Sequence, residues 1–288
     1  MAASRDPEIQ KRRIRRALRR YRERAGMTLQ QAADELDWSM SKVIRIELGT
    51  VTVSSGDLRA LLSLYGVMDQ ETMNDLVAAA KISRKRSWIH EFQGVIRPEY
   101  GQLISYEAAA NSVRIYHPTL IPGLLQTEAY TREIRCQSPL CEPEELQRRV
   151  ELLHRRQLSL EEPPPRFTFL IDEAALRRRI GGAATMLGQV RRLRELIDRD
   201  WLSIRAVLFA AGAHGSLSGP LFLIELPDDE GRVLFLEGSK DDTVVEDDAQ
   251  TIDNYDKIFL KLESIAESEE ETAGLLDALI LEYAEAAA

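Results

Sequence analysis

The stretch TLQQAADELDWSMSKVIRIELG at residues 28–49 decides the fold of the N-terminal part of the chain. Thr28 and Ser39 each precede a short amphipathic run, and a hydroxyl at such a place accepts a hydrogen bond from an unpaired amide at the start of a helix. Gly49 follows the second run, where glycine commonly ends a helix. The stretch therefore predicts two short helices joined by a tight turn.

This pattern fits a module that binds double-stranded DNA. In such a module one helix crosses the DNA backbone, and the N-terminal residues of the second helix meet base edges in the major groove. Val43 and Ile46 are spaced to face inward, and the small pair Ala32 and Ala33 allows a close helix crossing. Periodicity alone would fit an amphipathic helix of an unrelated bundle equally well. The candidate DNA contacts, at the helix starts and on the outer face, are Thr28, Gln30, Ser39, Met40, Ser41, Lys42 and Arg45.

Charge is unevenly distributed along the chain. The 288 residues include 38 Lys and Arg against 47 Asp and Glu, for a formal net charge of −9. Residues 1–26 nevertheless contain ten basic and three acidic residues, and residues 8–25 have the apolar spacing of a helix. A basic end on an acidic chain indicates contact with a polyanion, although a basic run can also be a solvated helix face. Arg12, Arg13 and Arg16 are therefore candidate phosphate contacts.

Two domains are predicted. Residues 1–85 read as an all-α helix-turn-helix domain, with further helices at 56–65 and 70–82. The polar and basic segment 83–87 lacks apolar periodicity and reads as the linker. Residues 88–288 then form a second and larger domain.

The second domain is predicted to have an α+β fold with a small sheet of about four strands. Residues 88–160 read as mostly helical, and the chain ends in helices at 247–267 and 271–286. The apolar spacing of these last helices also suggests a surface for dimerisation. Runs rich in β-branched and aromatic residues predict strands at 166–171, 202–209, 221–226 and 232–237.

Composition argues against a membrane or secreted protein. No apolar run approaches the ~20 residues that span a bilayer, and residues 1–24 lack the apolar centre of a secretory signal. We therefore expect a cytoplasmic protein that does not engage a membrane. Cys136 and Cys141 would be half of a four-cysteine metal site, so we expect ordinary thiols and no metal.

No catalytic arrangement stands out, so we expect neither an enzyme nor a bound cofactor. Residues 215–219 read Gly-Ser-Leu-Ser-Gly, with Leu217 where a nucleophile elbow needs serine. The chain has four histidines, and neither common glycine-rich phosphate loop is present. The glycine-rich loop around His214 could instead be a lid over a small molecule.

The first domain resembles the XRE-family helix-turn-helix of actinobacterial regulators. The resemblance rests on Thr28, Ala33 and the motif Trp38-Ser39-x-Ser41-Lys42-Val43-x-Arg45-Ile46-Glu47-x-Gly49. It implies that Glu47 pairs within the domain and does not touch DNA. Asp37 departs from the motif, since glycine is common at that place in the turn.

The second domain is similar to the C-terminal domain of WhiJ-like and Scr-type antitoxin-like regulators. The similarity is carried by the segment Ile121-Pro122-Gly123-Leu124-Leu125-Gln126-Thr127-Glu128-x-Tyr130, by Arg155-Arg156-Gln157, by the segment from Asp172 to Gly182, by Gln189 and Leu193, and by Gly212-x-His214-Gly215. It implies a small partner protein encoded nearby. Most of these residues also have a simpler structural interpretation. Leu124, Leu125, Tyr130 and Ile134 could be core residues, and Asp172 and Glu173 could cap the start of a helix. Arg155-Arg156-Gln157 could lie on a helix surface.

Together these features predict a homodimeric, sequence-specific transcriptional regulator. Its first domain would read an operator in double-stranded DNA. Its second domain would dimerise and sense a ligand or a small partner protein. The alternative is an antitoxin-like module that sequesters a small partner protein and autoregulates its operon.

Overall fold

The computed structural model describes residues 6–136, 142–158, 165–227 and 230–288. The chain divides into two compact units, Met1–Glu91 and Phe92–Ala288. The division falls a few residues beyond the segment that the sequence suggests as a linker.

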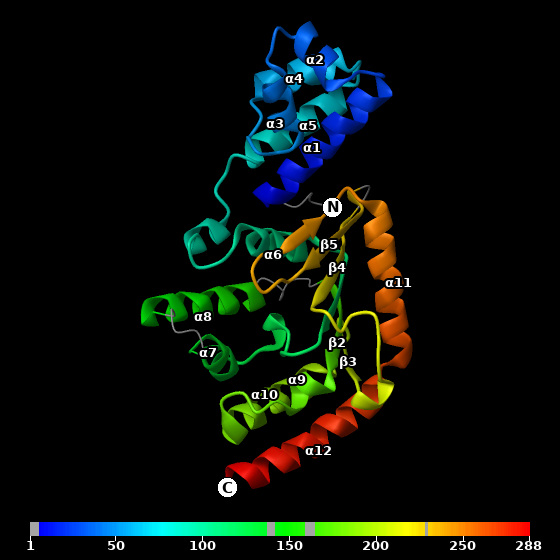
Figure 1. The fold of residues 1–288 in the computed structure, drawn as a ribbon. Coiled ribbons are helices and arrows are strands. Elements are labelled where there is room, and N and C mark those ends of the chain that lie inside the picture. Colours follow the sequence, from blue (N-terminus) through cyan, green and yellow to red (C-terminus); the bar gives the residue numbers. More distant parts are fainter. Residues whose placement is uncertain (1–5, 137–141, 159–164, 228–229) are drawn as a thin grey trace. The chain divides into compact units, whose positions relative to one another are not determined.

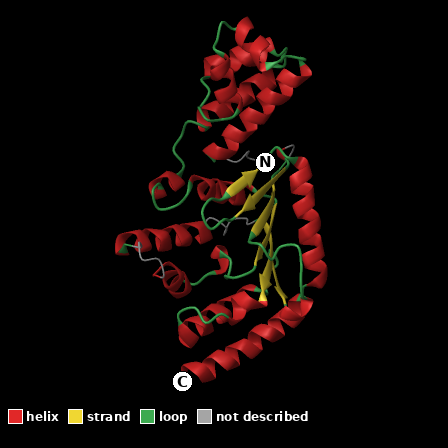
Figure 2. Cartoon of the chain, viewed as in Figure 1, coloured by secondary structure: helices red, strands yellow, loops and turns green. Residues whose placement is uncertain are grey.

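The first unit is helical, and all strands of the described residues belong to the second unit (Figure 2). A short 3-10 helix, η1 (Trp88–Phe92), lies where the two units divide. The helices of the first unit are α1 (Pro7–Arg24), α2 (Leu29–Glu35), α3 (Met40–Glu47), α4 (Ser55–Leu64) and α5 (Gln70–Ile82).

Side-chain caps explain where these helices begin. Asp6, Thr28, Ser39, Ser54 and Asp69 precede α1 to α5 in order, and each side chain accepts a hydrogen bond from a main-chain N–H in the first turn. Thr28 is part of a reciprocal capping box, because the side chain of Gln31 accepts from the Thr28 main-chain N–H. The prediction of Thr28 and Ser39 as caps is confirmed.

The turn between α2 and α3 is tight. Asp37 has a φ of 53°, in the left-handed region that aspartate tolerates better than most residues. The Trp38 N–H donates to the main-chain oxygen of Ala33 at 2.9 Å, which closes the turn. Aspartate is therefore accommodated at a place where glycine is common.

One core holds the first unit together. Leu18 of α1, Val43 of α3 and Leu58 of α4 are completely buried in it. Ala32 and Ala33 of α2 are equally buried, as predicted for a close crossing of α2 and α3. Core packing thus sets how α3 is presented.

The second unit contains one mixed sheet of six strands. Strands β1 to β3 are mutually parallel, and β4 to β6 are antiparallel to their neighbours. In spatial order the strands are β3 (Leu202–Val207), β2 (Arg166–Asp172), β1 (Ser112–His117), β4 (Leu221–Glu225), β5 (Arg232–Leu236) and β6 (Thr243–Val245).

The prediction of about four strands is therefore wrong, although the α+β class is right. The sequence pattern predicts neither β1, which lies in the stretch 88–160 that reads as mostly helical, nor the three-residue strand β6. β1 pairs with both β2 and β4 and is buried from Ile115 onward, so nonlocal pairing stabilises it. The last two expected strands, 221–226 and 232–237, are β4 and β5, which pair with each other in antiparallel orientation.

Helices flank both faces of this sheet (Figure 1). On one face α11 buries Ile252, Phe259 and Leu262 against strand residues that include Tyr116. The opposite face is flanked by helices from residues 98–196, which lie on the other side of the sheet from α11 (Figure 1). The helices of the second unit are α6 (Pro98–Ala109), η2 (Gly123–Leu125), α7 (Glu128–Cys136), α8 (Pro143–Leu158), α9 (Glu173–Arg177), α10 (Gly182–Leu196), η3 (Phe209–Ala211), α11 (Ala249–Ile265) and α12 (Glu269–Ala287).

The apolar stripes of the last two helices are used within the chain. Leu262 of α11 and Leu276 and Leu279 of α12 are almost completely buried, and α12 packs along α10. Side chains that are buried within the chain cannot contact a second copy, so the suggestion of a dimer surface is wrong for Leu262, Leu276 and Leu279. Within the described residues, no helix has the length and apolar character needed to cross a membrane.

Candidate DNA-binding interface

Helix α3 presents a polar start and outer face to solvent. The Ser39 hydroxyl accepts from the Lys42 N–H at 3.2 Å, and Ser39, Met40, Ser41 and Arg45 are all exposed. Val43 and Ile46 point the other way, into the core of the first unit. The predicted division of α3 into an outward polar face and an inward apolar face is confirmed.

Arg45 is the most accessible cation of α3. Its Nε donates to the Ser41 main-chain oxygen at 3.3 Å, which leaves the terminal nitrogens of the guanidinium for other partners. A guanidinium donates hydrogen bonds and accepts none, which matches the acceptors on guanine or on phosphate. Arg45 is thus well placed for a DNA contact.

Lys42 is held on its own unit, a placement that the sequence does not predict. Its Nζ lies 2.9 Å from Asp57 Oδ1 and 3.4 Å from the ring centroid of Trp38. Burial acts to raise the pKa of Asp57, but hydrogen bonds from Lys42 and from Ser54 outweigh it and keep the pKa below its usual value. A contact between Lys42 and DNA must therefore compete with Asp57.

The start of α2 presents the two remaining candidates. Thr28 is exposed, and its hydroxyl accepts from the Gln31 N–H at 3.2 Å. The exposed amide of Gln30 donates to Asp34 Oδ1 at 2.7 Å, one turn along the helix. The structure thus brings all the candidate residues of α2 and α3 to the surface of the first unit, and their contacts with DNA stay a prediction.

A buried ion pair joins the helix-turn-helix to α1. Nε of Arg22 lies 2.8 and 3.1 Å from the two carboxylate oxygens of Glu47, and Nη1 donates to the Met27 main-chain oxygen at 2.9 Å. The Tyr65 hydroxyl donates to Glu47 Oε1 at 3.3 Å. The hydrogen bond with Glu47 raises the pKa of Arg22. Glu47 pairs within the domain, as the family resemblance implies, and the sequence pattern does not predict Arg22 as its partner.

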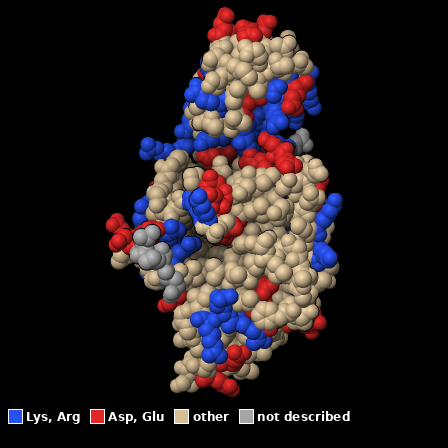
Figure 3. All heavy atoms as spheres, in the orientation of Figure 1, with Lys and Arg blue, Asp and Glu red and all other residues tan. Residues whose placement is uncertain are grey.

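The candidate phosphate contacts on α1 have mixed surroundings. Arg12 is only 2% exposed, Arg16 is half-buried, and Arg13 forms an ion pair with Asp75 of α5. Figure 3 shows Lys and Arg side chains gathered on part of the surface of the first unit. The phosphate role of Arg12, Arg13 and Arg16 stays a prediction.

Of two neighbouring motif residues in the second unit, Arg156 is buried and Gln157 is half-buried. Arg156 is 3% exposed, and its Nε and Nη2 donate to Glu107 at 2.8 and 2.6 Å. The suggestion that Arg156 belongs to a helix surface is therefore wrong, because a buried carboxylate lies opposite it. Gln157 donates to the main-chain oxygens of Leu124 and Gln126 and so holds η2.

The loop around His214 lies against the carboxyl ends of the parallel strands. His214 Nε2 is 3.3 Å from the Tyr116 hydroxyl, which donates to Asp172 Oδ2 at 3.1 Å. Asp172 also caps α9 by accepting from the Ala174 N–H, as predicted. Burial raises the pKa of Tyr116. Tyr130, Leu124 and Leu125 are buried core residues, as expected, whereas Ile134 is half-buried.

The structure describes one of the two cysteines. Cys136 is an exposed thiol at the end of α7, and Cys141 lies outside the described residues. No cluster of three or more His, Cys, Asp or Glu side chains that could hold a metal ion occurs in the described part of the chain.

Comparison with known families agrees with this division of the chain. Residues 13–76, which run from within α1 to within α5, match a family described as a Helix-turn-helix domain, and this match supports DNA binding by the first unit. Residues 100–278 match a Domain of unknown function (DUF5753). This second match covers more than half of the 288 residues, and the chain belongs to that family. No curated protein and no solved structure matches the chain.

Proposed function

We propose that this protein is a cytoplasmic, sequence-specific transcriptional regulator that reads an operator through α3. The observation that carries the proposal is the exposed polar start of α3, capped by Ser39 and mounted on a helix-turn-helix core. In such modules the N-terminal residues of the second helix contact base edges. The HTH assignment supports DNA binding, and the operator-reading role is our proposal.

The second unit supplies regulation in this proposal. One helix-turn-helix contacts a single half-site, and regulators of this type gain affinity by pairing two half-sites about 34–36 Å apart. Linking two copies makes the second contact intramolecular and raises the effective concentration. We therefore propose that the DUF5753 region dimerises the protein and receives a signal, and that the protein has no catalytic activity of its own.

A selection experiment tests the proposal. The full-length protein is incubated with a random double-stranded DNA library, and bound sequences are enriched and read. We expect a recurring motif with two related halves, and loss of this enrichment in Arg45→Ala. A library that stays random after repeated enrichment would overturn sequence-specific reading.

Purification from the native host distinguishes the proposed sensor role from the antitoxin-like alternative. A stoichiometric small protein that blocks operator binding would favour the antitoxin-like reading. Operator release without such a partner, in response to a small molecule, would favour a sensor.

A further inference from the structure

A cavity of about 380 Å³ lies inside the second unit. It is lined by residues from α6, α7, α8, η2 and the carboxyl end of β1, together with the segment that follows β5. Its volume falls within the usual range of small-molecule sites, about 300–1,000 Å³. Its wall combines apolar side chains, such as Ile121, Leu152 and Phe222, with several charged ones.

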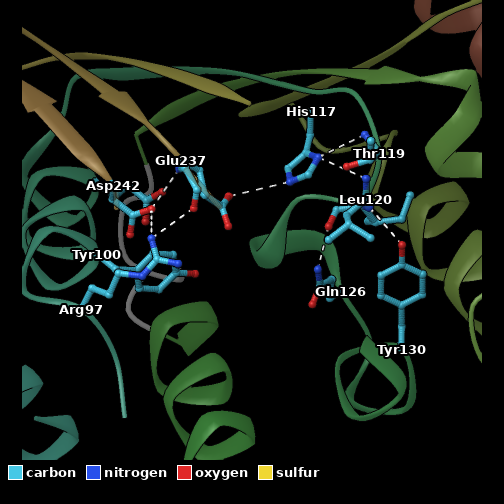
Figure 4. A network of polar contacts seen from close by, with 12 residues as sticks. Arg97, Tyr100, His117, Thr119, Leu120, Gln126, Tyr130, Glu237 and Asp242 are labelled. Atoms are coloured by element: carbon cyan, nitrogen blue, oxygen red, sulfur yellow. Dashed lines mark hydrogen bonds and ion pairs between the residues drawn. The ribbon is translucent and has the colours of Figure 1, made fainter. Parts of the chain in front are cut away.

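His117 offers one hydrogen-bond donor to this cavity (Figure 4). Its Nδ1 accepts from the N–H groups of Thr119 and Leu120 at 3.4 and 3.1 Å. The proton of the neutral ring must therefore sit on Nε2. Burial lowers the pKa of His117 to about 4, so the ring is neutral at physiological pH.

A gap separates this donor from an acceptor. Nε2 of His117 lies 3.8 Å from Oε2 of Glu237, too far for a direct hydrogen bond. One ligand hydroxyl could accept from Nε2–H and donate to the carboxylate. Burial raises the pKa of Glu237, although the nearby Arg135, Arg156 and Arg97 act to lower it. Glu237 and His117 therefore form a matched acceptor and donor across a gap.

Most guanidinium groups of the wall already have carboxylate partners. Arg156 pairs with Glu107, Arg97 with Asp242, and Arg149 with Glu145. Arg135 also lines the cavity, and it forms no ion pair with any residue that the structure describes. Its charge is close enough to act on both Glu237 and Tyr100. Arg135 is thus the cation of this wall that is available to a ligand anion.

We propose that this cavity binds a small hydroxylated organic acid. The ligand carboxylate pairs with Arg135, its apolar body packs on Ile121, Leu152 and Phe222, and its hydroxyl bridges His117 and Glu237. The ligand class rests on the signal-receiving role proposed for the second unit. Occupancy of the cavity is measured without DNA, so the two proposals fail separately.

The test measures binding of matched compounds to the full-length protein by ligand-observed NMR and calorimetry. The probes are salicylate, 4-hydroxybenzoate and 4-hydroxyphenylacetate, each with its primary amide, and benzoate as the acid without a hydroxyl. Each hydroxy acid should bind about tenfold or more tightly than its amide, as expected for one charge-assisted hydrogen bond. The hydroxy acids should also bind more tightly than benzoate.

Variants locate the site. Arg135→Gln should weaken the hydroxy acids about tenfold or more and leave their amides unchanged. Ile134→Trp should block every probe by filling the cavity. Glu237→Gln should change the preference for hydroxy acids over benzoate, because it replaces the acceptor carboxylate. Arg132→Gln is the matched control, since Arg132 lies one turn away on α7, pairs with Glu128 and does not line the cavity.

Three results would overturn the proposal. They are no binding of any acid at millimolar concentration, equal binding of acids and amides, and equal loss in Arg132→Gln and Arg135→Gln. If the acids bind as expected but the selection finds no DNA motif, the cavity assignment stands and the regulatory role fails. If a motif is found and no acid binds, only the cavity assignment fails.

Discussion

The guanidinium of Arg22 and the carboxylate of Glu47 form a forked ion pair between α1 and α3, and their side chains are only 12% and 7% exposed. The pair bridges 25 positions of sequence. Because both groups are desolvated, each depends on the other for its hydrogen bonds. Glu47 also accepts from the Tyr65 hydroxyl, and Arg22 also donates to the main-chain oxygen of Met27. The pair fixes the end of α3 relative to α1, and so sets how the outer face of α3 is presented.

Glu47→Gln should destabilise the first unit by about 3–5 kcal/mol, because it leaves the charge of Arg22 buried without its counterion. Hydrogen exchange of peptides from α1 to α3 in the full-length protein measures the loss. Glu23→Gln makes the same chemical change at the exposed pair with Arg19, and should cost no more than about 1 kcal/mol. Equal exchange in the two variants would contradict the structural role of Glu47.

Arg45→Ala should weaken binding to the selected operator by about 1–3 kcal/mol if the side chain is bidentate to a base. Lys42→Ala should also weaken it. Titration of labelled DNA at fixed salt measures both losses, and Lys81→Ala on the exposed face of α5 is the control. Unchanged affinity in both Arg45→Ala and Lys42→Ala would contradict the assignment of α3 as the helix that contacts DNA. Asp57→Asn should strengthen binding, because Lys42 no longer leaves a carboxylate to reach DNA.

Neutralising Arg12, Arg13 and Arg16 together should flatten the dependence of log affinity on log salt concentration by up to about three units. Each phosphate contact releases counterions, so the slope counts the contacts. Because Arg13 pairs with Asp75, we expect a smaller change than the maximum. The loss should be the same for specific and nonspecific DNA, since phosphate contacts carry no sequence information. A slope identical to that of the unmodified protein would identify these residues as a structural or solvated face.

Acid should destabilise the second unit through His117. Its pKa in the folded chain is about 4, against about 6.5 when unfolded, so protons bind the unfolded chain first as the pH falls. The contribution is complete above about pH 6.5 and is lost towards pH 4, by about 3 kcal/mol. His117→Asn keeps an acceptor for the N–H groups of Thr119 and Leu120 but does not titrate. Urea denaturation at both pH values should show the variant losing less stability, and parallel losses would refute the assignment.

Residues 92–288 expressed alone should be dimeric, whereas residues 1–91 alone should be monomeric and bind the operator weakly. The reason is that two linked helix-turn-helix modules bind two half-sites far better than one module binds one. Light scattering on each fragment, with a DNA titration of residues 1–91, checks both statements. A monomeric second fragment would exclude this unit as the dimerisation element. A first fragment that binds as tightly as the full chain would exclude a need for dimerisation.

Local signals were sufficient to predict the first unit. These signals are the hydroxyls of Thr28 and Ser39, the glycine at position 49 and the helical spacing of Val43 and Ile46. Each acts within one or two turns of helix, so it can be recognised in the sequence alone. The outer face of α3 follows from the same spacing.

Strand β1 could not be predicted from local sequence signals. Only two residues separate it from the end of α6, and its six residues become a strand by pairing with β2 and β4. Those partners lie tens of residues further along the chain. The six-stranded sheet therefore could not be counted from local pattern.

The sequence by itself determined the helix-turn-helix, the α+β class of the second unit and the residues exposed on α3. Only the tertiary structure decided that Arg22 pairs with Glu47, that Lys42 pairs with Asp57, and that His117 faces Glu237 across a cavity. The physical reason is that helix caps and periodicity are interactions between near neighbours. Ion pairs and cavities join side chains that are distant in sequence, and their partners are chosen by the packing of whole elements.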